Sequence, residues 1–581
     1  MPLSKRSWSS VGALASVYLV LALLLGPSAS AEDYVTISGE GSSWAGPAIA
    51  DMSANVSQFG MKVNYSPTSS TNGRTSFLNQ NVDFAASDIP FQYNPEDGSA
   101  PENPADKGIT YAYIPVTAGG TAFMYNLKVN GKQVNNLRLS GENVSKIFTG
   151  VITKWNDPAL QQENPGLVLP DRSITPVIRS GGSGSSAQFT RWMVSLYPQI
   201  WTDFCTRMGN NKCGSTSFYP QFTGSVAKNE DFAVTTQIKG SSGEGSIGYV
   251  NYSFALNEGL PVAKVLNAAG YYVEPTPENV AVSLLKAKIN MDTTSTEYLT
   301  QQLDEVYTDP DPRNYQLSSY SYFILPTNTS KKFTEDEGKT LGAFAYYAMC
   351  EAQRSSKTLG YSPLPVNLVT ASLEQIKKIP GVQVQNVDVK KCNNPTFSPD
   401  GTNLLAKNAP MPEECDKKGP AQCVSGTGGL TSPTGASSGA GAAAGGGGQG
   451  SGGANSDNPG GQSTGGGPTG PGQGVSGGKA VGSAGSVNSA AGGGKGLGTQ
   501  GGLGSVCDPD TGACGVAGDG TNIEATGSVG SLATAKSTVL DDSSGWSSTQ
   551  TLVALVFLLT LGLVFAPAFI WNRLSAKAES L

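Results

Sequence analysis

Residues 177–186 read Val-Ile-Arg-Ser-Gly-Gly-Ser-Gly-Ser-Ser. Apolar residues follow this stretch at helical spacing: Phe189, Trp192, Met193 and Leu196. The pattern predicts a strand that ends at Arg179, a turn of glycines and serines, and a helix directly behind the turn. Arginine offers a planar fork to an oxyanion, and Ser183 and Ser185 add hydroxyl donors beside it. The stretch therefore predicts a cradle for a tetrahedral oxyanion, with a loop of incidental serines as the alternative.

The alternation of strand and helix recurs near the start of the chain. We expect strands at 34–37, 61–65 and 83–86, and a helix over 47–59. Strand, helix and strand repeated at this spacing indicate an α/β architecture with a parallel core sheet. In open α/β sheets, ligands bind where strands end and helices begin.

Polar motifs occur at three further points of this kind. Ser43 and Trp44 follow a glycine-rich turn, Ser69 lies in a run of hydroxyl residues, and Asp88 ends a strand. Glycines let the backbone approach a ligand, and the free N–H groups of a helix N-terminus favour an anion. Ordinary helix capping by Ser or Asp is the competing interpretation of each motif.

Composition excludes several classes of function. The 581 residues include no histidine, which excludes Ser-His-Asp and Cys-His pairs, a histidine base and histidine metal ligands. A net charge of −7 argues against a nucleic-acid binder that relies on phosphate contacts. An enzyme on phosphate esters would need a nucleophile with an acid or base, or metal ions, and no acidic metal cluster is evident. We expect a binding protein without cofactor, metal or catalytic residues.

The N-terminus predicts export. Lys5 and Arg6 precede an apolar run that ends in small residues at 29–31. This is typical of a secretory signal peptide at 1–31, with an uncleaved anchor as the alternative.

The C-terminus predicts a membrane anchor. Residues 551–571 are uncharged and apolar over a length that can cross about 30 Å of hydrocarbon. Arg573 and Lys577 follow, which places the short tail 572–581 in the cytoplasm and the rest of the mature chain outside. The chain is thus predicted to be a single-pass protein of the cell membrane. A buried core helix is the alternative.

The eight cysteines agree with an oxidising compartment. Near neighbours suggest four disulfides: Cys205/Cys213, Cys350/Cys392, Cys415/Cys423 and Cys507/Cys514. Zinc binding is the alternative, and it is weak because no pair has CxxC spacing and no histidine completes a site.

A tract rich in Gly, Ser and Ala at 425–545 separates the folded body from the predicted anchor. It has too few large apolar residues to bury a core and is predicted to be disordered. A chain of about 120 such residues has an r.m.s. span of roughly 60 Å. The tract therefore predicts a flexible tether.

Several segments in one order carry a family resemblance. They are GEGSSW, VDFAASDIP, IPVTAGG, IFTGVITKWNDPAL, RSGGSGSS, GSIGYVNY and YSYFIL. With them, the chain from about 35 to 370 resembles the extracytoplasmic phosphate-binding proteins that serve phosphate ABC importers. The resemblance implies a two-lobe type II periplasmic-binding-protein fold. Lobe one would comprise 32–117 plus 314–424, and lobe two 118–313.

The resemblance also implies a set of phosphate-binding residues: Ser43, Trp44, Ser69, Asp88, Arg179, Ser183, Gly184 and Ser185. Asp88 would accept the proton of hydrogen phosphate, so that sulfate, which carries none, meets a repulsive carboxylate. Gly181 stands where many members have an Asp that pairs with the clamp arginine, which implies a less constrained Arg179.

The function implied by this resemblance is capture of inorganic phosphate outside the cell and its delivery to an ABC permease. A tethered surface receptor or scavenger that is not coupled to uptake is the alternative, for which the tether is the motive. No nucleic-acid partner is expected.

Overall fold

The computed structural model describes residues 34–435, 506–507 and 514–515. The chain divides into two units, Met1–Asn455 and Ser456–Leu581. In the second unit the described residues are two short strands, β16 (Val506–Cys507) and β17 (Cys514–Gly515), which pair antiparallel. The predicted signal peptide, most of the tether and the predicted anchor at 551–571 lie outside the described residues. Among the residues that are described, no helix has the length and apolar character needed to cross a bilayer.

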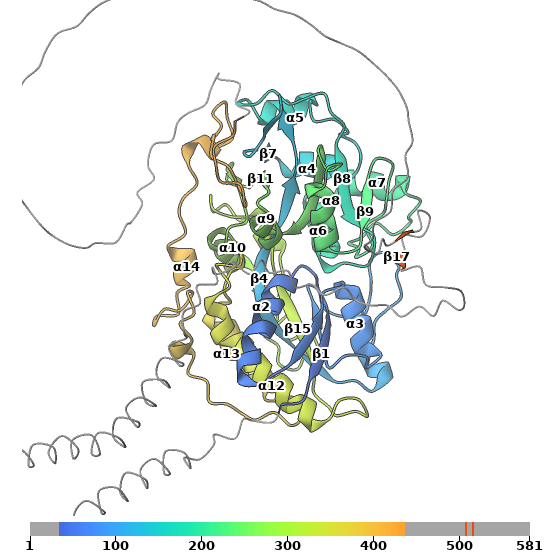
Figure 1. Cartoon of the computed structure of the whole chain (residues 1–581), viewed down its shortest axis with the longest axis vertical. Coiled ribbons are helices and arrows are strands. Elements are labelled where there is room, and N and C mark those ends of the chain that lie inside the picture. The colour runs from blue at the N-terminus through green and yellow to red at the C-terminus, as the bar shows by residue number, and fades with distance from the viewer. Residues whose placement is uncertain (1–33, 436–505, 508–513, 516–581) are drawn as a thin grey trace, which may run out of the picture. The chain divides into compact units, whose positions relative to one another are not determined.

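One mixed eight-stranded sheet organises the first unit, in the order β2-β1-β3-β15-β4-β10-β8-β9. At one end of the sheet the parallel strands are β2 (Val63–Ser66), β1 (Ile37–Gly41) and β3 (Phe84–Ser87). They form lobe one, in the lower half of Figure 1. At the other end the parallel strands are β10 (Ser246–Asn251), β8 (Thr175–Arg179) and β9 (Val226–Lys228). They form lobe two, in the upper half of the same view.

Two long strands join the lobes. The first, β4 (Tyr111–Tyr125), pairs antiparallel with β15 (Ser318–Pro326) through its first ten residues and with β10 through its last five. Because β4 belongs to both halves of the sheet, the boundary between the lobes falls within it, between Gly120 and Thr121. The expected two-lobe α/β fold is confirmed. The parallel sheet is confirmed for each flank, whereas the centre is antiparallel because the joining strands run against their neighbours.

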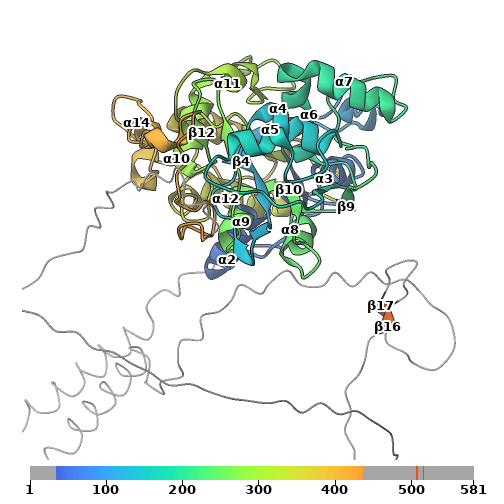
Figure 2. The same cartoon turned by 90° about the horizontal axis from the view of Figure 1, so that it is seen from above.

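Helices cover the faces of both halves. Those of lobe one are α2 (Gly46–Val56), α3 (Ser70–Leu78), α12 (Glu335–Met349) and α13 (Val366–Ile376). Those that follow β4 and precede β15 are α4 (Gly141–Phe148), α5 (Pro158–Glu163), α6 (Gly184–Leu196), α7 (Pro198–Arg207), α8 (Asp231–Lys239), α9 (Tyr252–Glu258), α10 (Pro277–Ser283) and α11 (Asp304–Thr308). Figure 2 shows α4 to α7 on the far side of β4 and β10 from α8 and α9. The remaining helix, α14 (Leu404–Lys407), packs on α10.

Short strands complete lobe two and its surroundings: β5 (Lys128–Val129), β6 (Lys132–Gln133), β7 (Arg138–Leu139), β11 (Lys264–Leu266), β12 (Tyr272–Val273), β13 (Lys288–Ile289) and β14 (Gln301–Gln302). An aromatic cluster fixes α6 to the sheet. Phe189 on α6 packs against Phe123 of β4, Phe148 of α4 and Tyr249 of β10, and all four side chains are fully buried. Large buried aromatic rings of this kind dominate core energetics, so the start of α6 is held firmly.

The first strand of the structure begins three residues later than predicted. It was expected at 34–37, whereas β1 runs over Ile37–Gly41 and contains the predicted glycine-rich turn. The glycines serve close packing: a Cβ on Gly39 would lie 2.2 Å from the Phe84 ring, and one on Gly73 of α3 would lie 2.5 Å from the Gly41 Cα. The predicted helix over 47–59 is α2 followed by a 3₁₀ turn at Ser57–Phe59.

Three predicted disulfides are confirmed: Cys205–Cys213, Cys350–Cys392 and Cys415–Cys423. The side chains of Cys507 and Cys514 lie outside the described residues, although their backbones face each other across β16 and β17.

The segment 415–435 contacts lobe two, in contrast to the predicted boundaries, which gave 314–424 to lobe one and began the tether at 425. Buried Arg138 donates to the carbonyls of Cys415 and Ala421, and Thr427 Oγ1 donates to the Val262 carbonyl at 2.6 Å. Side chains of the segment take part as well: Asp416 pairs with Lys264 at 2.6 Å, and Gln422 Nε2 donates to the Asn136 carbonyl. These partners lie 152 and 286 residues away along the chain, so the sequence alone does not display the contacts.

We predict that the disulfides differ in their contributions to stability. Cys350–Cys392 has a sequence separation of 42 and Cys205–Cys213 one of 8. Chain entropy then predicts that replacing the first pair with Ala lowers the free energy of unfolding by about 4 kcal/mol, against about 2.6 kcal/mol for the second. Urea unfolding of the two double variants measures the difference. Equal losses would contradict the entropic account.

Candidate functional site

Polar side chains of both lobes meet where β1, β3 and β8 end. Arg179 is the last residue of β8, Asp88 directly follows β3, and Ser42 and Ser43 directly follow β1. All four are buried. The strands β1 and β3 run in the same direction as β4, from lobe one towards lobe two, whereas β8 runs the opposite way. Their carboxyl ends therefore face each other across the boundary between the lobes. The site therefore lies between the lobes.

Arg179 is held from two sides. Its Nη1 donates to Asp231 Oδ2 at 2.6 Å, and its Nε and Nη2 donate to the Asn229 carbonyl. Its Nη2 also donates to Ser43 Oγ of lobe one at 3.1 Å. A guanidinium buried in this way needs such partners to offset the loss of hydration.

Asp231, at the start of α8, was missed by the sequence analysis. It is fully buried, and it accepts hydrogen bonds from the Ser43 hydroxyl at 2.6 Å and the Asn251 amide at 3.2 Å. Its pairing with Arg179 corrects the expectation that Gly181 leaves this arginine less constrained. The carboxylate is present, but it comes from another element, 52 residues along the chain. The only signal in the sequence was an acidic residue that follows a strand and opens a helix.

Asp88 accepts two hydroxyl hydrogen bonds within lobe one. Ser42 Oγ donates to Oδ1 at 2.6 Å, and Ser70 Oγ lies 3.1 Å from Oδ2. Burial raises the pKa of Asp88, and the charge of Asp231 adds to this, while the hydroxyl hydrogen bonds oppose it. The carboxylate thus has a stronger tendency than usual to hold or share a proton.

Gly184 brings the helix α6 up to Asp88. A Cβ at this position would lie 2.4 Å from Ser70 Oγ and 2.7 Å from Asp88 Oδ2, so only glycine permits the approach. Ser183 is the N-cap of α6, with its Oγ 2.8 Å from Ser185 Oγ. The start of α6 and the Asp88 carboxylate therefore form opposite walls of one site.

The remaining predicted residues have different positions. Ser69 is the N-cap of α3 and accepts from the Asn72 amide, whereas the neighbouring Ser70 faces Asp88. The Trp44 ring points away towards the joining strand β4, where its Nε1 donates to Thr121 Oγ1 at 3.1 Å. Of these two, only the Trp44 backbone remains a candidate ligand group, and Ser42 and Ser70 join the set.

The arrangement suits a small, multiply charged oxyanion. It combines a guanidinium, several hydroxyls and the start of α6, whose first amides have no helical partner. Within residues 34–435, one group resembles a metal-ligand set, namely Glu413, Cys415 and Cys423. Its two sulfurs form a disulfide, so they offer no thiolate to a metal.

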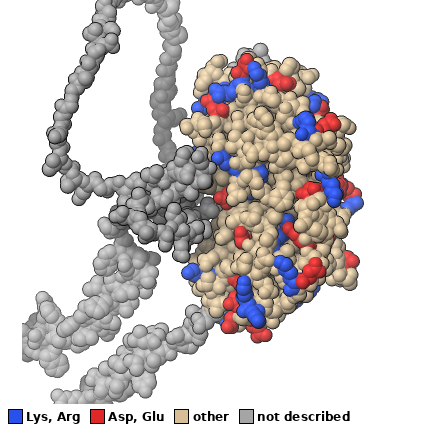
Figure 3. All heavy atoms as spheres, turned by 90° about the vertical axis from the view of Figure 1, so that its right-hand side faces the viewer, with Lys and Arg blue, Asp and Glu red and all other residues tan. Residues whose placement is uncertain are grey.

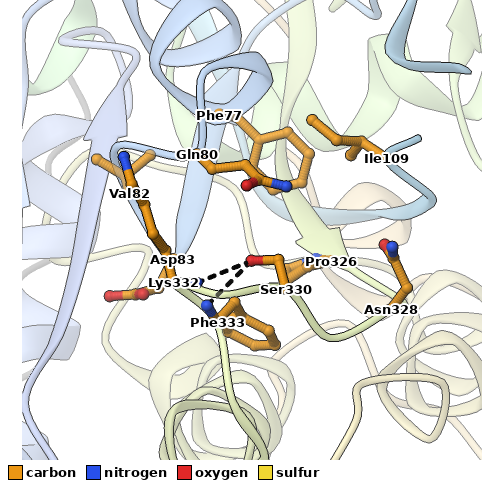
Figure 4. Close-up of a pocket in the computed structure, with 10 residues that line it drawn as sticks. All are labelled: Phe77, Gln80, Val82, Asp83, Ile109, Pro326, Asn328, Ser330, Lys332 and Phe333. Carbon is orange, nitrogen blue, oxygen red and sulfur yellow. Dashed lines mark hydrogen bonds between the residues drawn. The ribbon is translucent and has the colours of Figure 1, made fainter. Parts of the chain in front are cut away.

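Two surface features lie apart from this site. A cavity of about 30 Å³ in lobe one, shown in Figure 4, is lined by side chains such as Phe77, Asp83 and Phe333 and includes none of the site residues. The face in Figure 3 shows basic and acidic side chains interspersed, with no continuous basic tract.

Comparisons with known proteins place the chain in a family. The model of the PBP superfamily domain matches residues 26–352. The phosphate-binding protein PstS of Xylella fastidiosa (strain 9a5c) is 30% identical over 344 residues, which are 59% of this chain and 85% of the relative. The phosphate-binding protein PstS 2 of Mycobacterium tuberculosis is 30% identical over 308 residues, 53% of this chain and 76% of the relative.

Among solved structures, a high affinity periplasmic phosphate-binding protein (PfluDING) bound with phosphate aligns with a TM-score of 0.46 at 18% identity. The alignment covers 61% of this chain and all of that one. The family model spans more than half of the chain, and the curated relatives are matched over most of their length. The chain therefore belongs to the PBP superfamily and, within it, to the PstS-like proteins.

Proposed function

We propose that the chain binds inorganic phosphate between its two lobes and delivers it to the permease of a phosphate ABC importer. The observation that carries this proposal is the meeting of Arg179, the start of α6 and the buried Asp88 in one site. Curated relatives that match the chain are named as phosphate-binding proteins. We propose a binding role with no reaction.

The site selects its ligand by both its charge and its proton. Arg179 and the hydroxyls stabilise a dianion, with helix amides at the start of α6 adding favourable dipoles. Among the residues that the structure describes, no cation pairs with Asp88, and this carboxylate accepts the proton that hydrogen phosphate carries at neutral pH. Sulfate has no such proton, and its oxygens would face a buried carboxylate. The ligand set is Ser42, Ser43, Ser70, Asp88, Arg179, Ser183, Gly184 and Ser185, together with the backbone of Trp44.

Closure couples binding to delivery. Ser43 of lobe one bonds to both Arg179 and Asp231 of lobe two, so the site is complete only when the lobes are together. A permease can then distinguish the closed, loaded shape from the open one. Uptake that depends on the head would favour this role over that of an uncoupled surface receptor.

We further propose that the chain is held at the outer face of the cell membrane by the apolar segment 551–571, through the tract that follows residue 435. The charges beside the segment and the signal-like N-terminus support this arrangement. A truncation at residue 545 would then release the protein from the membrane fraction.

Titration calorimetry tests the ligand. We expect heat of binding with phosphate, and with sulfate none, for the original protein. In Asp88→Asn the amide no longer repels an unprotonated oxyanion, so sulfate should bind measurably. Asp106→Asn, which changes an exposed carboxylate of lobe one, is the control. Absence of phosphate binding by folded, ligand-stripped protein would overturn the proposal.

The raised pKa of Asp88 predicts how stability depends on pH. The folded-state pKa of Asp88 lies above the unfolded value of about 3.9. The protonated carboxyl group therefore contributes its full stabilisation of the fold below about pH 3.9. This contribution is lost as pH rises through the folded-state pKa. Without phosphate, Asp88→Asn should therefore melt at a higher temperature than the original protein at pH 7.5, but not at pH 3.5. Equal melting temperatures at pH 7.5 would contradict this reading.

Asp231 is predicted to position Arg179. Asp231→Asn should raise the Kd for phosphate about ten- to hundredfold, because a charged hydrogen bond to the guanidinium is lost. Glu244→Gln, which breaks the Arg172–Glu244 pair of lobe two and involves no residue of the site, is the control. In the Asp231→Asn background, Gly181→Asp should restore part of the affinity, since a Cβ at 181 meets only Asn229 Oδ1, at 3.3 Å. Calorimetry measures all four proteins, and failure of the rescue would show that the position of the carboxylate matters beyond its charge.

A further inference from the structure

Two consecutive acidic residues of lobe one reach across to lobe two, away from the anion site. Glu96 Oε1 accepts from Arg191 Nη1 at 2.8 Å, and its Oε2 accepts from the backbone amide and the hydroxyl of Ser215 at 3.0 and 2.9 Å. Asp97 Oδ2 accepts from the Thr216 hydroxyl at 2.5 Å. We call these five residues the rim latch.

The lobe-two side of the latch is rigid. The disulfide Cys205–Cys213 closes the loop that leads to it, and buried Trp201 donates from its indole to the Cys213 carbonyl at 3.1 Å. The hydroxyl of Thr190 on α6 accepts from the Thr216 amide at 2.8 Å and donates to its carbonyl at 3.0 Å. Little side-chain or backbone freedom therefore remains to be lost when the latch engages.

The lobe-one side is tied down at its base. Glu102 accepts from the buried Arg74 Nε at 2.7 Å and from the Gln92 amide at 2.9 Å, and its own amide donates to the Gln92 carbonyl. These bonds close the loop that carries Glu96 and Asp97. Both halves of the latch are thus held in position by bonds within their own lobe.

One helix connects the latch to the anion site. The helix α6 begins at Gly184, against Asp88, and carries Arg191 two turns later. Between them, Gln188 Nε2 donates to the Asp88 carbonyl of lobe one at 2.9 Å. Because Gly184 and Arg191 lie on the same helix, a rigid-body movement of lobe two that withdraws the start of α6 from Asp88 also moves the backbone of Arg191 relative to Glu96.

The charges in the latch support the bonds. Burial alone would raise the pKa of Glu96, but the hydrogen bonds from Ser215 and the charge of Arg191 outweigh it and lower that pKa. For Asp97, the hydrogen bonds from Thr216 and Ser99 likewise outweigh burial and lower the pKa. Both carboxylates accept as anions at neutral pH.

We propose that the rim latch sets how long the closed protein retains its ligand, by holding the lobes together at a point away from the anion site. This inference rests on the proposed function, because the ligand whose release it controls is phosphate. Opening must break these bonds before phosphate leaves, whereas the encounter of phosphate with the open form does not involve them. The latch therefore acts on the dissociation rate.

The test is stopped-flow release of inorganic phosphate from the full-length chain into an excess of a fluorescent phosphate sensor. Glu96→Gln and Asp97→Asn should each release phosphate about three- to fivefold faster, with an association rate close to that of the original protein. Glu244→Gln is the matched control, because it breaks an Arg–Glu pair of similar exposure, Arg172–Glu244, within lobe two alone. It should leave the release rate unchanged.

A double-mutant cycle identifies the interaction. Arg191→Met should accelerate release as Glu96→Gln does, and combining the two should add little to either. Preference for phosphate over sulfate should stay unchanged in every latch variant, in contrast to Asp88→Asn. Release at the original rate, or equal acceleration by Glu244→Gln, would overturn the proposal.

A second measurement separates the latch from the identity of the ligand. Spin labels at Lys107→Cys and Val168→Cys, exposed positions on lobe one and lobe two, report the distance between the lobes. In ligand-free full-length protein, Glu96→Gln should shift the distance distribution to longer values, and Glu244→Gln should not. Absence of phosphate binding with this shift present would refute the proposed function and retain the latch. An unchanged distribution would refute the latch.

Discussion

A guanidinium and a carboxylate, both withdrawn from water, hold this site together. Arg179 and Asp231 come from different elements of lobe two, and each alone would carry a large desolvation cost. Paired, they leave Arg179 with a donor directed at Ser43 of lobe one, so the same group that compensates the buried carboxylate also joins the lobes. The arrangement of β8, β9 and α8 places these two charges within 2.6 Å of each other, and the anion site takes its shape around them.

The polar residues at the strand ends could be recognised in the sequence because their pattern is local. Arg179 ends an apolar strand and precedes a glycine-serine turn, and Asp88 ends another strand, so residue type and spacing indicated polar groups at both strand ends. The role of Asp88 as a ligand was implied by the family resemblance. Asp231 was missed because its role depends on a contact 52 residues away, which a single sequence does not display. Ser69 and Ser70 were confused because the exact start of α3 decides which hydroxyl caps the helix and which faces Asp88.

The sequence predicted the fold class correctly, but not the exact ends of its strands and segments. Alternating strands and helices indicated an α/β architecture, and the family resemblance implied its division into two lobes. The strand β1 nevertheless extends through glycines that resembled a turn, because the absence of a Cβ allows α3 and Phe84 to pack closely there. Residues 415–435 bind lobe two through carbonyls that accept from Arg138 and Asn136, and through side chains such as Asp416, which pairs with Lys264. Every one of these partners is more than 150 residues away along the chain, so a single sequence does not display the attachment.

The attachment of residues 415–435 to lobe two determines which lobe moves relative to the C-terminal end. Gly428 donates its amide to Glu274 and Asn135 donates to the Ser432 carbonyl, so the last described part of the body is fastened to lobe two. Relative to whatever follows residue 435, a hinge motion within β4 and β15 would leave lobe two in place and move lobe one. A force applied to the C-terminal end would act on lobe two directly and would reach lobe one only through the joining strands. Tension in the C-terminal segment therefore does not by itself separate the lobes.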